Sequence, residues 1–206
     1  MRRVRVGLAS ALRRATARCE GYTVSFITSY QEVLDFWFIE LGAKNWFAKS
    51  DEIDASIRKR FGATHMAAVA CELYSWRSDA DGRLAEIIVL DQFSRNIFRD
   101  DARAFSADPM ALALAQEAIA QGYDANLTSQ QKAFLYMPFM HSESRSMHEQ
   151  AELLYSSPGF EYNLEFERKH KVIIDRFGRY PHRNALLGRA SSAAEIAFLL
   201  ETDSAF

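Results

Sequence analysis

The chain has 206 residues, of which 49% are hydrophobic and 25% are charged, and its formal net charge is −2. These proportions are typical of a globular protein and exclude a disordered chain, a collagen and a coiled-coil rod. No apolar run approaches the roughly 18 residues that cross a bilayer, so we expect no transmembrane segment.

The N-terminus differs in charge from the rest of the chain. Its first 19 residues contain six arginines and no acidic residue. We interpret residues 1–23 as an Arg-rich extension, disordered or non-native; a transit peptide or a membrane-surface helix is the alternative. The remainder has a net charge of −8, which disfavours nucleic-acid binding because phosphates require a basic surface.

Residues 24–206 are predicted to form a single all-helical domain. Ala, Leu and Met outnumber Val, Ile and Thr by more than two to one, which favours helix over strand. Short connections between consecutive helices favour stacked antiparallel helix hairpins. We expect helices over residues 29–40, 51–60, 63–77, 82–92, 108–121, 129–141, 144–156, 162–176 and 192–201.

Several helix ends carry local signals. Ser29, Thr128 and Ser192 each precede a Glu or Gln by three residues, a spacing that predicts capping boxes. Gly122 predicts a left-handed residue just after a helix. Cys71 lies in an Ala-rich run and is predicted to be a small buried residue. Because the two cysteines of the chain indicate neither a disulfide framework nor a zinc site, we expect a reducing, cytoplasmic setting.

Three segments combine charged and amide side chains with aromatic residues: 91–99, 137–143 and 175–189. Between residues 168 and 189 there are seven Lys or Arg and one acidic residue. Guanidinium groups match carboxylate and phosphate geometry. We therefore predict a pocket that binds an anionic small molecule or a peptide carboxylate. The candidate ligand-binding residues are Arg95, Asn96, Arg99, Arg179, Arg183 and Asn184.

A purely structural interpretation of the same residues stays open. Asp91 and Arg95 lie four residues apart, as do Asp175 and Arg179, so each pair can form an ion pair on one helix face. The two asparagines can cap helix ends and turns. The arginines would then brace distant helices rather than hold a ligand.

A third hypothesis is an enzyme that uses His141 as a general acid or base on an anionic substrate, helped by Glu143 or His182. Residues 141 and 143 reach one site only if their helix ends near Met140. A metal site is not predicted, because the single Glu-x-x-His motif at residues 167–170 lacks the second copy that di-iron bundles use. We expect no cofactor. The 13% share of aromatic residues allows a homodimer interface.

Longer motifs resemble a known family. They are Val33-Leu-Asp-Phe-Trp-Phe38, the segment Leu90–Arg99 with Ala104-Phe105, Met137-Pro-Phe-Met-His-Ser-Glu143, and Arg176–Asn184 with Leu187-Gly-Arg189. Over residues 30–203 the chain resembles the bacterial domain-of-unknown-function family 924. This resemblance implies an all-helical, tetratricopeptide-like superhelix. It implies no activity and no catalytic residue. Ser94 departs from the proline that is usual in the family pattern.

Overall fold

The computed structural model describes residues 26–201, and within that range the chain is all-α, with no β-strand. The predicted extension over residues 1–23 lies outside the described residues. The single domain over residues 24–206 and the tetratricopeptide-like form of the superhelix stay predictions.

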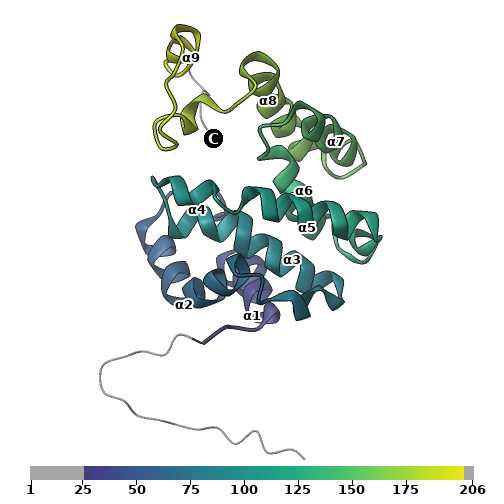
Figure 1. The fold of residues 1–206 in the computed structure, drawn as a ribbon. Coiled ribbons are helices and arrows are strands. Elements are labelled where there is room, and N and C mark those ends of the chain that lie inside the picture. The colour runs from purple at the N-terminus through teal and green to yellow at the C-terminus, as the bar shows by residue number, and fades with distance from the viewer. Residues whose placement is uncertain (1–25, 202–206) are drawn as a thin grey trace, which may run out of the picture.

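The helices follow one another with short connections (Figure 1). They comprise α-helices and segments of π or 3₁₀ helix, the latter labelled η. In chain order they are α1 (Tyr30–Leu34), η1 (Asp35–Leu41), α2 (Asp51–Val69), η2 (Tyr74–Ser78), α3 (Ala80–Ile88), η3 (Val89–Phe93), α4 (Ser94–Ile97), η4 (Ala102–Phe105), α5 (Asp108–Ala120), η5 (Tyr123–Asn126), α6 (Ser129–Met140), α7 (Arg145–Tyr155), α8 (Glu161–Phe177), η6 (Pro181–Arg183) and α9 (Ala193–Phe198).

The helix-end signals are largely confirmed. Ser29, Thr128 and Ser192 each form a complete capping box. Gly122 adopts φ +76°, the left-handed conformation expected after α5. These signals act through the backbone of one or two turns, so they do not depend on tertiary contacts.

Two predictions around α2 are wrong. The helices expected over 51–60 and 63–77 are one helix up to Val69, which runs unbroken through Gly62. Cys71 is exposed, not buried, and has φ +60°. It occupies the left-handed position just after the helix C-cap, which glycine usually fills. A non-glycine residue there gives no sequence signal, so the predicted helix ends too late.

The main core extends from Val33 to Phe160 and is rich in aromatic side chains. Trp37, Phe61 and Phe93 are fully buried, and the rings of Trp37 and Phe134 meet edge to face with centroids 5.4 Å apart. Burial of such large side chains is the dominant stabilising term of the fold. The aromatic contacts join α2, η3 and α6 to η1, so the polar side chains close to these contacts are held in place.

A π-helical segment, η3, joins α3 to α4 within one continuous helical stretch. Side chains of α4 hydrogen-bond back to main-chain carbonyls of this segment. Here the carbonyl of Leu90 accepts from Ser94 Oγ at 2.5 Å, and that of Asp91 accepts from Arg95 Nη1 at 2.6 Å. The first polar segment therefore begins on this irregular turn.

The C-terminal segment (residues 178–201), drawn in yellow-green, carries η6 and α9 and lies above α4 in Figure 1. Its apolar anchor is small. Tyr180 and Phe198 pack with Ile173, Ile174 and Phe177 of α8 in a cluster separate from the main core. Polar contacts must therefore contribute much of its attachment to the rest of the protein.

Candidate functional site

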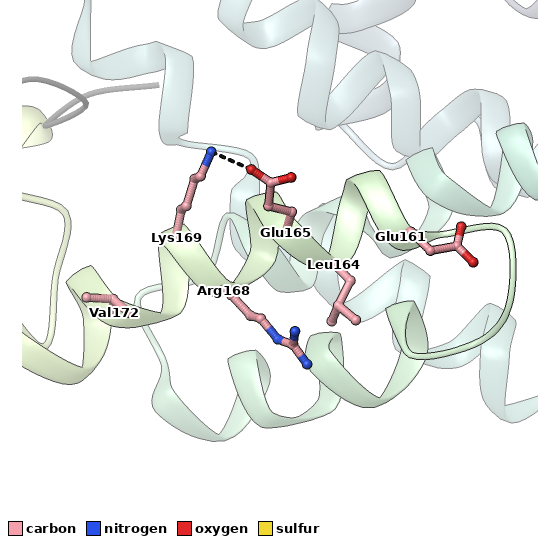
Figure 2. A pocket seen from close by; sticks show the side chains of 6 residues that line it. All are labelled: Glu161, Leu164, Glu165, Arg168, Lys169 and Val172. Carbon is pink, nitrogen blue, oxygen red and sulfur yellow. Dashed lines mark ion pairs between the residues drawn. The ribbon is translucent and has the colours of Figure 1, made fainter.

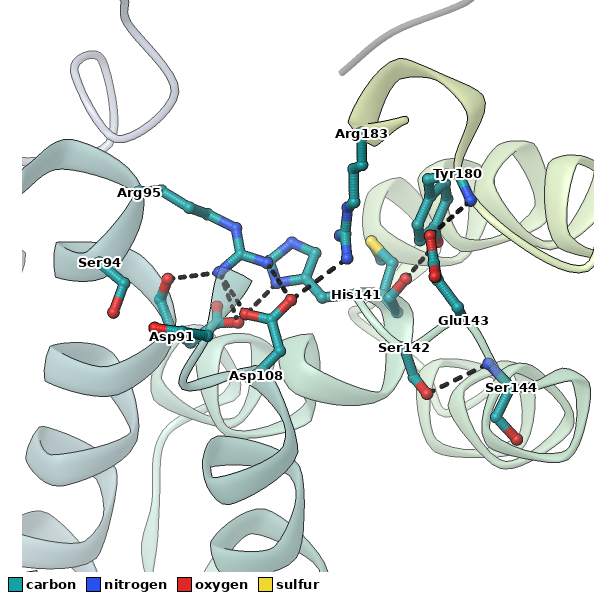
Figure 3. A network of polar contacts seen from close by, with 12 residues as sticks. Asp91, Ser94, Arg95, Asp108, His141, Ser142, Glu143, Ser144, Tyr180 and Arg183 are labelled. Carbon is teal, nitrogen blue, oxygen red and sulfur yellow. Dashed lines mark hydrogen bonds and ion pairs between the residues drawn. The ribbon is translucent and has the colours of Figure 1, made fainter. Parts of the chain in front are cut away.

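Asp108, the first residue of α5, binds two arginines that lie far apart in the sequence (Figure 3). Arg95 donates to both of its carboxylate oxygens at 2.9 and 3.1 Å, and Arg183 donates through Nη1 at 3.2 Å. An acidic residue in the first turn of a helix is also stabilised by the helix dipole. The fold thus brings together two of the predicted ligand-binding arginines, with a carboxylate between them.

Arg183 is buried, with 7% of its surface exposed. Its guanidinium lies between the rings of Phe105 and Tyr180, 4.5 Å from each centroid. Burial and the nearby charge of Arg95 lower the pKa of Arg183. Among the described residues, no hydrogen-bond partner meets its Nε. The two rings therefore hold the plane of the Arg183 guanidinium, and its buried Nε–H remains without an acceptor among the described residues.

His141 pairs with a buried carboxylate. The end of α6 at Met140 places His141 at the helix C-cap, as the catalytic hypothesis required. Its Nδ1 lies 2.7 Å from Oδ1 of Asp91, a residue only 1% exposed. Burial and the charge of Arg95 lower the pKa of His141, against the opposing effect of Asp91. The ring is therefore neutral at neutral pH, and its Nδ1–H donates to Asp91.

Asp91 stays ionised despite its burial. Burial alone would raise its pKa, but the charge of Arg95 and hydrogen bonds from His141 and Gln92 hold the pKa of Asp91 well below its usual range. Arg95 Nη1 lies 3.2 Å from its Oδ1, so the predicted i,i+4 pair is present. Asp91 therefore connects His141 to the arginine network.

Glu143 does not join His141. Its carboxylate accepts from both terminal nitrogens of Arg189, at 2.6 and 2.9 Å, and from the backbone N–H of Tyr180 at 2.8 Å. Burial would raise the pKa of Glu143, but Arg189 and the Tyr180 N–H lower it. Glu143 thus ties the loop after α6 to the C-terminal segment.

His182 lies beside Tyr180, with ring centroids 5.4 Å apart. Burial and the charge of Arg183 lower the pKa of His182 to about 4. Within residues 26–201 its Nδ1 is buried and has no hydrogen-bond partner. His182 is therefore an uncharged neighbour of Arg183 rather than a partner of His141.

A second histidine–carboxylate pair was missed from the sequence. His148 and Glu167 are both fully buried, with Nδ1 and Oε1 2.7 Å apart. The other ring nitrogen, Nε2, lies 2.8 Å from the carbonyl oxygen of Ser142 and 3.2 Å from the hydroxyl of Tyr180. In the sequence these are two polar residues, 19 positions apart, on helix faces that are otherwise apolar. That spacing does not identify them as partners.

The other predicted site residues lie in two separate clusters. Arg99 and Asn96 both donate to Asp54 of α2, Arg99 at 2.5 and 2.8 Å and Asn96 at 2.8 Å. Arg179 donates to Glu195 at 2.6 and 2.8 Å, and Asn184 approaches the same carboxylate at 3.3 Å. These residues therefore end on carboxylates of the chain itself.

The predicted pair between Asp175 and Arg179 is wrong, because Lys171 binds Asp175 at 2.6 Å and Arg179 turns to Glu195. Residue 178 is a glycine with φ +70° that ends α8. Arg179 thus lies beyond the helix on which an i,i+4 pair would form.

Two surface grooves lie away from this network. One, of about 510 Å³, runs along α8 and is lined by Glu161, Leu164, Glu165, Arg168, Lys169 and Val172 (Figure 2). The other, of about 450 Å³, lies between α2 and the segment after α4; it is lined by Arg58, Gly62, His65, Met66, Ile97, Phe98 and Arg103. Neither contains a residue predicted from the sequence to bind the ligand or to act in catalysis.

In the part of the chain that the structure describes, no group of three or more His, Cys, Asp or Glu side chains is arranged to hold a metal ion. None of the helices there combines the length and the apolar character needed to cross a membrane.

Comparison with known proteins agrees with the motifs. Residues 33–203 match the family model described as a bacterial protein of unknown function, DUF924. A solved structure of a protein of unknown function, ATU0120 from Agrobacterium tumefaciens, is 36% identical in sequence. The match covers 83% of this chain and 96% of that one, with a TM-score of 0.79. No significant match was found among curated proteins.

Proposed function

This chain belongs to the DUF924 family of bacterial proteins of unknown function, and from the geometry of its polar network we propose that it binds a carboxylate-bearing ligand at Arg183. The ligand is an anionic small molecule or the terminal carboxylate of a peptide. Arg95 and His141 flank the site. The observation that carries the proposal is one edge of the Arg183 guanidinium.

That edge consists of Nε and Nη2, the two donors that match both oxygens of a carboxylate. In four other arginines it holds a carboxylate of the chain through two hydrogen bonds of 2.5–3.0 Å: Arg77 with Glu86, Arg99 with Asp54, Arg103 with Asp101, and Arg179 with Glu195. Arg183 instead binds Asp108 through Nη1, and among residues 26–201 its buried Nε meets no acceptor.

A buried donor without an acceptor costs about 1–3 kcal/mol. A ligand carboxylate on this edge would remove that cost and would form two charge-assisted bonds. The rings of Phe105 and Tyr180 hold the guanidinium plane in advance, so little orientational entropy is lost on binding. The proposal thus assigns ligand binding to Arg183 and bracing roles to Arg99 and Arg179.

A thermal-shift titration of the full chain tests the proposal, with acetate, benzoate, N-acetyl-alanine and inorganic phosphate as probes. At 100 times its dissociation constant a probe stabilises the protein by about 2.7 kcal/mol, or roughly 5–11 °C for a chain of this size. We expect Arg183→Met to abolish the shift. Arg179→Met is the matched control, since its edge is already filled by Glu195.

The proposal fails if no carboxylate shifts the unfolding temperature of the wild type, or if Arg183→Met and Arg179→Met respond alike. A shift produced by phosphate and by no carboxylate would assign the site to phosphate instead. Each outcome is read against the unliganded stability of the same variant, so that a loss of folding is not mistaken for a loss of binding.

A second candidate function is proton transfer by His141, and it rests on the Asp91 contact. A carboxylate at Nδ1 orients an imidazole so that Nε2 carries the lone pair that takes a proton. The lowered pKa of His141 keeps this base free at neutral pH. With p-nitrophenyl acetate as substrate, turnover should be level above pH 6.5, fall in acid and vanish in His141→Gln. Equal turnover in His141→Gln and wild type would refute it.

A further inference from the structure

The groove between α2 and the segment after α4 has the features of a second binding site, independent of Arg183. Helices α2 and α4 pack side by side at the left of Figure 1, and the groove lies along them and the residues just after α4. The volume of the groove, about 450 Å³, falls in the range of small-molecule pockets. Its apolar lining comes from Met66, Ile97 and Phe98, and two arginines, Arg58 and Arg103, also line it.

The two arginines differ in their charge compensation. Arg103 lies over the ring of Phe98, 4.5 Å from its centroid, and forms a bidentate pair with Asp101. Arg58 donates to the carbonyl of Ile97 at 2.5 Å, and within the described part of the chain it forms no ion pair. The charge of Arg58 acts on the carboxylate of Asp54, but Asp54 is already bound by Arg99 and Asn96. Arg58 therefore brings to the groove a positive charge that has no ion-pair partner of its own among the described residues.

His65 supplies a hydrogen-bond acceptor. Its Nε2 lies 2.8 Å from Ser94 Oγ, and the only proton of that hydroxyl is donated to the carbonyl of Leu90. Nε2 must therefore carry the hydrogen of the ring. Burial lowers the pKa of His65, which keeps the ring neutral. Nδ1 is then a lone-pair acceptor on a residue that lines the groove.

Gly62 lies in the groove in the middle of α2. Glycine weakens a helix interior relative to alanine. Packing does not require it here, because a Cβ at this position would meet no atom within 4 Å. Because Gly62 has no side chain, the groove stays open at this position.

From these features we propose that the groove binds a small amphipathic carboxylate, with an aryl or short alkyl body and a hydrogen-bond donor. The carboxylate pairs with Arg58, the apolar body lies on Met66, Ile97 and Phe98, and the donor binds Nδ1 of His65. One cation without an ion-pair partner of its own matches the single charge of a carboxylate better than the double charge of a phosphate monoester.

The test is an NMR titration of the ¹⁵N-labelled full chain with 3-hydroxyphenylacetate, hexanoate and the uncharged 3-hydroxyphenylacetamide. We expect saturable shifts of the amide signals of Gly62, Ile97 and Phe98 with the carboxylates. The amide should bind at least tenfold more weakly than the matching acid, because it lacks the charge that pairs with Arg58.

Three variants complete the test. Gly62→Leu fills the groove with a good helix former, so it should abolish binding while the unfolding temperature stays the same or rises. Arg58→Met should weaken binding about tenfold. Lys59→Met removes the same charge from a neighbouring exposed position of α2 and should leave binding unchanged.

Absence of saturable shifts in the wild type with both acids overturns the proposal, as does unchanged binding in Gly62→Leu. Equal weakening by Arg58→Met and Lys59→Met also contradicts it, since it would indicate attraction by overall charge. None of these results depends on Arg183, so they test this groove separately from the first site.

Discussion

Replacing Asp108 with asparagine removes the one charge that Arg95 and Arg183 share while preserving the shape of the side chain. The side chain of Asp108 is 14% exposed and that of Arg183 is 8% exposed. Breaking a buried ion pair by removing one partner costs about 3–5 kcal/mol, because the remaining charge stays buried. Arg95 keeps Asp91 as a second partner. We therefore expect the free energy of unfolding to fall by about 3 kcal/mol, the lower end of that range.

For a chain of this size a loss of about 3 kcal/mol lowers the unfolding temperature by roughly 6–12 °C. Urea unfolding followed by circular dichroism measures the free energy, and calorimetry measures the temperature. Glu165→Gln is the control, because it removes the exposed Lys169–Glu165 pair, and such pairs contribute about 0–1 kcal/mol.

A double-mutant cycle identifies the cause of the loss. In Asp108→Asn the buried charge of Arg183 has no counter-ion, so adding Arg183→Met should cost nothing further and should restore part of the stability. The coupling energy should lie between about 0.5 and 3 kcal/mol. Strictly additive effects, or an Asp108→Asn variant as stable as Glu165→Gln, would refute the view that Asp108 holds Arg183.

Three further predictions concern stability. Gly62→Ala should raise the free energy of unfolding by about 0.5–1 kcal/mol in urea, since the added Cβ meets no neighbour; a decrease would reveal a steric conflict. Tyr180→Phe should lower the free energy of unfolding by about 1–3 kcal/mol in calorimetry, because the hydroxyl donates to the buried carbonyl of Met140 at 2.5 Å. An unchanged free energy would show that this bond does not stabilise the fold. The pKa of His182 is about 4 in the folded protein and near 6.5 in the unfolded chain. Between these values the unfolded state binds more protons, so the free energy of unfolding should fall as the pH drops from 6.5 to 5. His182→Asn should weaken this dependence, and an identical pH profile would exclude His182 as its source.

The sequence predicted the features of the fold that are encoded over one or two turns. Capping boxes at Ser29, Thr128 and Ser192 and the left-handed Gly122 involve neighbouring residues only, and all four are present. The end of α2 is not predictable in this way, because Cys71 adopts the left-handed conformation without being glycine.

The partners of the arginines were not predictable in the same way. Arg183 and Asp108 are 75 residues apart, and Arg99 and Asp54 are 45 apart. The i,i+4 rule identified the pair of Asp91 with Arg95, which share one helical stretch, but failed for Arg179, which lies beyond the end of α8. The order of residues along the chain shows that arginine and aromatic residues cluster. The tertiary structure decides which carboxylate each arginine binds.

Bracing and binding need not exclude each other at Arg183. The apolar anchor of the C-terminal segment is small, and Arg183, Arg189 and Arg179 attach or order the segment through Asp108, Glu143 and Glu195 respectively. Arg179 and Arg189 each bind a carboxylate of the chain through two nitrogens, whereas Arg183 forms a single bond to a carboxylate that Arg95 also uses. A ligand on the remaining edge of Arg183 would therefore bind best when the segment is docked on Asp108. By linkage, it would stabilise the docked segment by the same free energy.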